Sequence, residues 1–201
     1  MSSVAAGDAR QAFHTLRRLV PKADDAERCG LCRQPLAPQH DHLIDPRTRR
    51  LLCSCQACAI LFNNPAAQYK RVPKRVQFLP DCEISDAEWD DLMIPIGIAF
   101  FIKQSTGENS DRIAAFYPSP AGPVESLLSL DVLHPALNRL EPDTEALLVN
   151  RAARESFILP IDECYRLVGL MRAHWKGLSG GADVWREIQL FFQEMKNRAH
   201  A

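Results

Sequence analysis

Cys29-Gly-Leu-Cys32 and Cys53-Ser-Cys55-Gln-Ala-Cys58 together hold five of the seven cysteines of this 201-residue chain within 30 residues. Each Cys-x2-Cys turn directs two thiolates toward one point, so two such turns can form a closed tetrahedral site of four sulfur ligands. The two turns are separated by 22 residues, which is close to the spacing of zinc sites built from two cysteine pairs. An odd number of cysteines argues against a disulfide framework. The sequence therefore predicts a metal site with Cys29, Cys32, Cys55 and Cys58 as ligands.

The residues between the two cysteine pairs predict a β-hairpin. Residues 42–45 and 50–54 have the pattern of short strands, and Pro46-Arg47-Thr48-Arg49 has the composition of the turn that joins them. A hairpin flanked by two Cys-x2-Cys turns is typical of a zinc ribbon. We expect a first unit over residues 1–80, with a short helix over residues 8–20 and a zinc-ribbon-like module after it.

Three further side chains leave the ligand set open. On an extended strand Cys53 and Cys55 point to one face, about 6.6 Å apart, so Cys53 could replace a ligand, join the set or lie beside it. His42 begins the opposite strand and could reach the same metal, whereas His40 and His42 are expected to form a solvated pair on a polar turn. His42 and Cys53 are therefore reserve ligands. Zinc is the expected metal, and iron is the alternative because the same four thiolates accept either ion.

Two other interpretations of the cysteines are less favoured. Free cysteines are often small buried side chains, but their paired spacing argues against that reading here. A Cys-x2-Cys pair can also act as a redox-active dithiol, although such motifs usually occur singly. A closed site of four cysteines is usually structural, because it leaves no position open for a substrate.

Residues 81–201 predict a second unit, an α+β domain with helices packed on a small antiparallel sheet. Ser85 and Glu88 form a capping-box pattern at the start of a short helix. The segments expected as strands are residues 96–104, 112–117, 146–150 and 157–161. The segments expected as helices are residues 85–93, 124–140, 162–175 and 183–198, the last of them capped by Asp183.

The charge is divided unevenly between the two units. Residues 1–80 hold 13 Lys and Arg against 6 Asp and Glu, a net charge of +7, and residues 81–201 have a net charge of −8. Two docked units would explain this asymmetry. The basic stretch over residues 69–79 also admits nucleic-acid binding, but an edge strand with solvated charges is preferred, since the overall pI is near 6.6. We expect protein partners and regard nucleic acid as unlikely.

The chain shows no sign of membrane insertion or of an enzyme motif. Its longest apolar run, Ile94–Ile102, is nine residues, against the roughly 20 that span a bilayer. The N-terminus lacks the features of a signal peptide, so a cytoplasmic location is expected. No phosphate-binding loop, nucleophile elbow or zinc-protease motif is present. Cys164 could pair with His134 or His174 as a nucleophile, but a core position is favoured and no catalytic activity is expected.

Several strings occur together that resemble a bacterial family of unknown function, over about residues 27–198. They are the two cysteine motifs, His40-x-His42-Leu43, Ile94-Pro-Ile-Gly-Ile-Ala-Phe-Phe101, Phe116-Tyr-Pro-Ser-Pro-Ala-Gly122, Glu145-Ala-Leu-Leu-Val-Asn-Arg151, and Pro160-Ile-Asp-Glu-Cys-Tyr-Arg-Leu-Val-Gly-Leu170 followed by Gly177-x-Ser-Gly-Gly181. Genes of that family usually lie in clusters for NiFe uptake hydrogenases. The resemblance implies a non-catalytic accessory protein that binds hydrogenase subunits or maturation factors. A rubredoxin-like iron electron carrier and a zinc-ribbon nucleic-acid-binding regulator are the alternatives.

Overall fold

A computed structural model describes residues 27–63, 68–82, 84–105, 112–126, 135–177 and 179–200. Within these residues the chain forms two antiparallel sheets and four α-helices, which agrees with the predicted α+β class. The helix expected over residues 8–20 lies outside the described residues. No helix in the described part of the chain is both long enough and apolar enough to cross a membrane.

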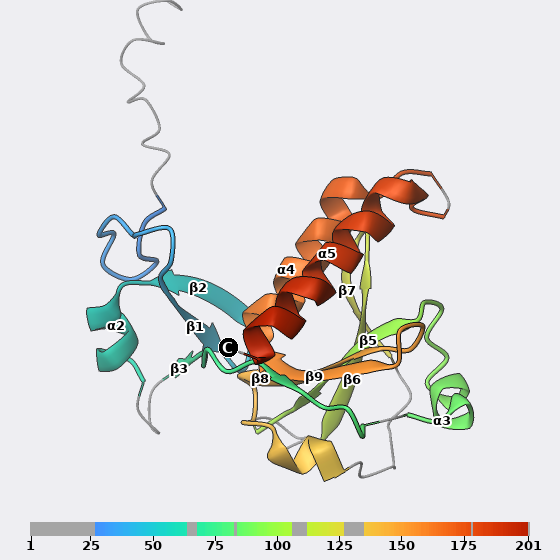
Figure 1. Ribbon diagram of the computed structural model, residues 1–201. Helices are drawn as coiled ribbons and strands as arrows, with labels where there is room; N and C mark the ends of the chain where they lie inside the picture. The colour runs from blue at the N-terminus through green and yellow to red at the C-terminus, as the bar shows by residue number, and fades with distance from the viewer. Residues whose placement is uncertain are drawn as a thin grey trace, which may run out of the picture.

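The smaller sheet has the strand order β2-β1-β3 and contains the predicted hairpin. Strand β1 (Asp41–Asp45) pairs antiparallel with β2 (Arg50–Ser54), so that His42 lies opposite Cys53. Strand β3 (Lys70–Arg71) pairs with the other edge of β1. The short helix α2 (Gln56–Leu61) follows β2 directly, and Figure 1 shows it at the far end of this sheet from the main body.

The larger sheet has six strands in the order β4-β9-β8-β5-β6-β7, and every neighbouring pair is antiparallel. Their bounds are β4 (Gln77–Phe78), β5 (Ile98–Lys103), β6 (Ile113–Ser119), β7 (Gly122–Glu125), β8 (Glu145–Asn150) and β9 (Glu155–Pro160). Four of these strands match predicted segments. The expected helix over residues 124–140 is wrong in its described parts, since Val124 and Glu125 end β7 and residues 135–139 form a 3-10 helix, η1 (Pro135–Arg139).

Both faces of the larger sheet are buried, in two separate clusters of apolar side chains. Along β5, Phe100 and Ile102 belong to one cluster, whereas Ala99 and Phe101 belong to the other, as the alternation of side chains along a strand requires. The first face is covered by α4 (Ile161–His174) and α5 (Gly181–Ala199), which run side by side in Figure 1. The second face is covered by α3 (Asp86–Asp91) and η1.

The helix starts follow the sequence in one case and depart from it in another. Ser85 and Glu88 form the predicted capping box at the start of α3. Asp183 does not cap α5. Gly180 is the N-cap residue, with a φ of 88°, and Asp183 in the first turn instead accepts a hydrogen bond from Lys176. A glycine can adopt this left-handed conformation without strain.

The smaller sheet packs against the main body through its own apolar side chains. Ile44 of β1 and Val72 after β3 belong to the same cluster as Phe100 and the helices α4 and α5. Strand β4, at residues 77–78, is already an edge strand of the larger sheet. The division into units at residue 80 stays a prediction.

Candidate metal centre

The first pair of cysteines lies on a tight turn before β1. The Arg33 N–H donates to the Cys29 carbonyl at 2.9 Å, and Arg33 takes a positive φ of 67° to close the turn. The Gly30 N–H donates to the Cys53 carbonyl at 2.8 Å, which joins this turn to the end of β2. These bonds hold Cys29 and Cys32 beside the second cysteine motif.

The second pair lies on the first turn of a helix. Cys55 is the N-cap residue of α2, and Cys58 is a buried residue within it. The Ala59 N–H donates to the Cys55 carbonyl at 2.9 Å, as in a regular helical turn. Two residues three apart on a helix face the same side, so both thiols are directed toward the first turn.

The structure brings the four predicted cysteines together. Their sulfur atoms all lie within 4.8 Å of one another, and Cys32 Sγ and Cys55 Sγ are 3.7 Å apart. Four thiolates bound tetrahedrally at about 2.3 Å from an ion are separated by about 3.8 Å from each other. The donor set and its spacing therefore suit a tetrahedral metal ion.

The pKa values of the clustered thiols are shifted in opposite directions, so that one thiol ionises more easily than its neighbours. Burial opposes ionisation of Cys29, but hydrogen bonds from the backbone at Cys32, Cys55 and Leu31 outweigh it and lower the pKa of this thiol to about 6. Burial, together with hydrogen bonds to the neighbouring thiols, raises the pKa of Cys58 to about 12. A bound cation would allow all of these thiols to be deprotonated, because metal ligation favours the thiolate.

The two reserve ligands lie in a different group. His42 and Cys53 form, with His40, a second set of potential ligands whose donor atoms lie within 4.8 Å of one another. Cys53 and Cys55 do not lie on one extended strand, because β2 ends at Ser54 and Cys55 starts a helix. Burial raises the pKa of the Cys53 thiol, and the nearby Glu27 and Cys29 raise it further.

The histidine pair differs from the solvated pair that the sequence predicts. The side chain of His40 is only 8% exposed, and its Nδ1 lies 2.9 Å from the Ala37 carbonyl oxygen. Nδ1 of His42 lies 2.7 Å from Oδ2 of Asp162 at the start of α4. The sequence does not predict that Asp162 is a partner of His42, because 120 residues separate the two and no local pattern links them.

The basic stretch around β3 is paired with acidic residues. Lys70 Nζ lies 2.7 Å from Oδ2 of the buried Asp143, and Arg75 lies 2.6 Å from the buried Glu145. Arg71 and Lys74 lie 3.1 Å and 3.2 Å from Asp41. Two of these four cations therefore bind carboxylates of the acidic half of the chain, as expected if the two halves dock on each other.

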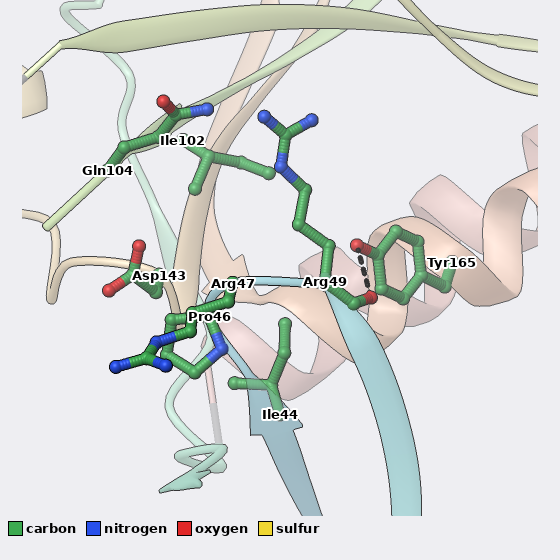
Figure 2. A pocket seen from close by; sticks show the side chains of 8 residues that line it. All are labelled: Ile44, Pro46, Arg47, Arg49, Ile102, Gln104, Asp143 and Tyr165. Atoms are coloured by element: carbon green, nitrogen blue, oxygen red, sulfur yellow. Dashed lines mark hydrogen bonds between the residues drawn. The ribbon is translucent and has the colours of Figure 1, made fainter. Parts of the chain in front are cut away.

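A pocket lies where the β1–β2 turn meets β5 and α4, and Figure 2 shows Arg47, Arg49 and Tyr165 among its lining residues. The Arg49 guanidinium donates to Glu125 at 2.9 Å and lies over the Phe116 ring. The Tyr165 hydroxyl donates to the Arg49 carbonyl at 3.3 Å. Arg49 therefore contacts β6, β7 and α4 from the β1–β2 turn. The pocket lies at this contact between the two sheets.

The remaining cysteines are part of the protein interior. Cys164 is fully buried in the cluster beneath α4 and α5, and burial raises its thiol pKa well above the usual value. This agrees with the predicted core position. Cys82 is 8% exposed and packs on the second face of the sheet. His134 lies outside the described residues.

The comparison with protein families places residues 28–199 in a family of unknown function (DUF5947). Since this match covers most of the chain, the protein belongs to that family. No curated protein and no solved structure matches it.

Proposed function

We propose that this protein is a non-catalytic accessory protein whose zinc-ribbon-like module is stabilised by one zinc ion bound to Cys29, Cys32, Cys55 and Cys58. The observation that carries the proposal is the convergence of these four sulfur atoms within 4.8 Å. A closed site of four thiolates leaves no coordination position for a substrate. Its role is therefore structural, and the function lies in the surface that the module presents.

The exposed end of α2 supports a role in protein–protein contacts. Ile60, Leu61 and Phe62 are 61%, 70% and 40% exposed, whereas the preceding Ala59 is buried. Adjacent exposed apolar side chains are typical of interaction sites. They follow Cys58 directly, so the metal would fix the helix that presents them.

The partner that we propose is a component of NiFe hydrogenase assembly, either a hydrogenase subunit or a maturation factor. This part of the proposal rests on the resemblance of the sequence motifs, and the protein would act in the cytoplasm. Nucleic acid is a poorer candidate, because Lys70, Arg71, Lys74 and Arg75 are all engaged with carboxylates. Phosphate binding needs such cations to be available.

A binding experiment with matched variants tests the proposal. Purified wild-type protein would be mixed with purified hydrogenase large and small subunits and with purified hydrogenase maturation factors, beside Leu61→Glu and a control, Leu190→Glu, on α5. Leu190 is 57% exposed and distant in sequence from the metal module. We expect binding that is lost in Leu61→Glu and kept in Leu190→Glu. Absence of binding by the wild-type protein, or equal binding by both variants, would contradict the proposed surface.

The metal is tested separately by elemental analysis and a visible spectrum of protein purified without oxygen. A colourless protein with zinc supports the structural site. Iron with thiolate charge-transfer bands and reversible reduction would instead support the electron carrier, because four cysteines bind either ion.

A further inference from the structure

The strongest feature outside the four-cysteine cluster is the group formed by His40, His42 and Cys53. One nitrogen of each imidazole and the Cys53 sulfur lie within 4.8 Å of one another. The two histidine rings are 4.9 Å apart between centroids and meet edge to face at 71°. His42 and Cys53 lie directly opposite each other on β1 and β2, and His40 precedes β1, so a rigid hairpin positions the group.

The hydrogen bonds of both rings select the same nitrogen for a ligand. Nδ1 of His40 lies 2.9 Å from the Ala37 carbonyl oxygen, which can only accept, so this nitrogen carries the proton. Nδ1 of His42 lies 2.7 Å from the Asp162 carboxylate and donates to it in the same way. In each neutral ring the lone pair is then on Nε2. A carbonyl or carboxylate behind a histidine is the usual arrangement for a metal ligand.

An unsatisfied buried atom points to a missing ligand. Nε2 of His40 is buried and has no hydrogen-bond partner. The whole His40 side chain is only 8% exposed. Oxygen Oε2 of Glu27 lies 3.6 Å from that nitrogen, beyond hydrogen-bond distance. A buried acceptor without a partner destabilises the fold, and a metal ion bound to Nε2 would supply the missing partner.

We propose that His40, His42 and Cys53 form a second metal site, separate from the four-cysteine site, that binds a divalent transition metal of the zinc class. The ligands are Nε2 of each histidine and the Cys53 thiolate. Asp162 is a positioning residue that orients His42 from the start of α4. Imidazole and thiolate are the ligands that zinc prefers.

Three protein ligands leave one position of a tetrahedral zinc ion to be filled. Glu27 is 63% exposed and does not belong to the group whose donor atoms lie within 4.8 Å of one another, so the fourth position is left to an outside ligand or to a movement of the Glu27 side chain. Because His42 is on β1 and Asp162 is on α4, their hydrogen bond also joins this group to the main body.

Zinc stoichiometry of the full chain, combined with zinc X-ray absorption, tests this site independently of the first one. Wild-type protein saturated with zinc and then desalted is expected to hold two zinc ions per chain, with imidazole nitrogen in the averaged ligand shell. His40→Ala and Cys53→Ser should each lose one zinc ion and the imidazole signal. The controls are His174→Ala, at the end of α4, and Cys82→Ser, and both should keep two.

Asp162→Asn keeps the size of the side chain and guards against a variant that fails to fold. We expect it to bind the second zinc 10–100-fold more weakly in competition with a chelator, as for other residues behind a metal-bound histidine. One zinc per chain with sulfur ligands only, or two zinc ions retained in His40→Ala, would overturn the proposal. Cys32→Ser distinguishes the two sites, because Cys32 is a ligand of the four-cysteine site only. This variant should keep one zinc ion per chain, with both nitrogen and sulfur ligands.

Discussion

Replacement of Cys58 by serine removes one ligand of the four-cysteine site with little change in side-chain size. The smaller sheet has few other sources of stability. In residues 27–63 the buried apolar side chains besides cysteines are Leu43, Ile44 and Ala59, and Ile44 belongs to the main core. Burial of one leucine contributes about 1.5–3 kcal/mol. A structural zinc ion contributes about 10–16 kcal/mol, so the proposed metal would dominate the stability of this sheet.

Shared over the four proposed ligands, a zinc contribution of this size is about 2.5–4 kcal/mol per thiolate. Loss of that amount would make local opening about 60- to 700-fold more frequent, since 1.4 kcal/mol corresponds to a factor of ten. The assay is hydrogen–deuterium exchange of the full chain. In Cys58→Ser we expect about 60- to 700-fold faster exchange at the amides of Cys29, Gly30 and Leu36, whose hydrogen bonds hold the first turn.

Amides of β8 and β9 should keep their protection in Cys58→Ser, because these strands lie in the middle of the larger sheet. The matched control is Cys82→Ser, which removes a buried thiol outside the cluster and should leave the exchange of residues 27–63 unchanged. Wild-type exchange over residues 27–63 in Cys58→Ser, with the metal content also unchanged, would refute the reasoning.

Three further predictions concern the body of the protein. Arg75→Ala leaves the carboxylate of Glu145, which is 1% exposed, without its guanidinium partner; we expect a loss of about 1–3 kcal/mol in urea unfolding, and a loss below 0.3 kcal/mol would contradict this. Burial raises the pKa of Tyr165 to about 12. An alkaline titration followed by absorbance should therefore show a step near pH 12 that is missing in Tyr165→Phe. A missing step near pH 10 instead would be evidence against the buried hydroxyl. Because this pKa is raised in the folded state, its contribution to stability is present below pH 10 and is lost as the pH rises toward 12. Gly180→Ala places a Cβ 2.8 Å from a valine methyl at a positive φ, so it should lower the melting temperature more than Gly177→Ala, which has a positive φ but open space; equal losses would mean that φ alone matters.

Local patterns in the sequence predict the parts of this fold that local physics decides. The capping box at Ser85 depends on two side chains three residues apart, and the continuous apolar, β-branched and aromatic run over residues 96–104 is enough to predict a buried strand. The four cysteines are predicted because a Cys-x2-Cys turn determines where its own two thiols point. These features require no knowledge of distant contacts.

The sequence-based predictions are wrong where contacts between residues far apart in the sequence determine the local structure. Val124 and Glu125 have helical spacing, but pairing with β6 makes them a strand. Residues 60–62 are apolar, which predicts burial, yet no described neighbour covers them. The sequence predicts that His40 and His42 are a solvated polar pair on a turn. In the structure, α4 places Asp162 2.7 Å from His42. A sequence pattern cannot anticipate a partner that approaches from 120 residues away.

The most direct test of the metal site is the metal content of purified full-length protein, wild type beside the double variant Cys32→Ser/Cys55→Ser. These two sulfur atoms are 3.7 Å apart and come from different turns, so their joint replacement removes half of the site. The account predicts that the double variant contains one zinc ion per chain fewer than the wild type. Equal metal content in the two proteins would contradict it.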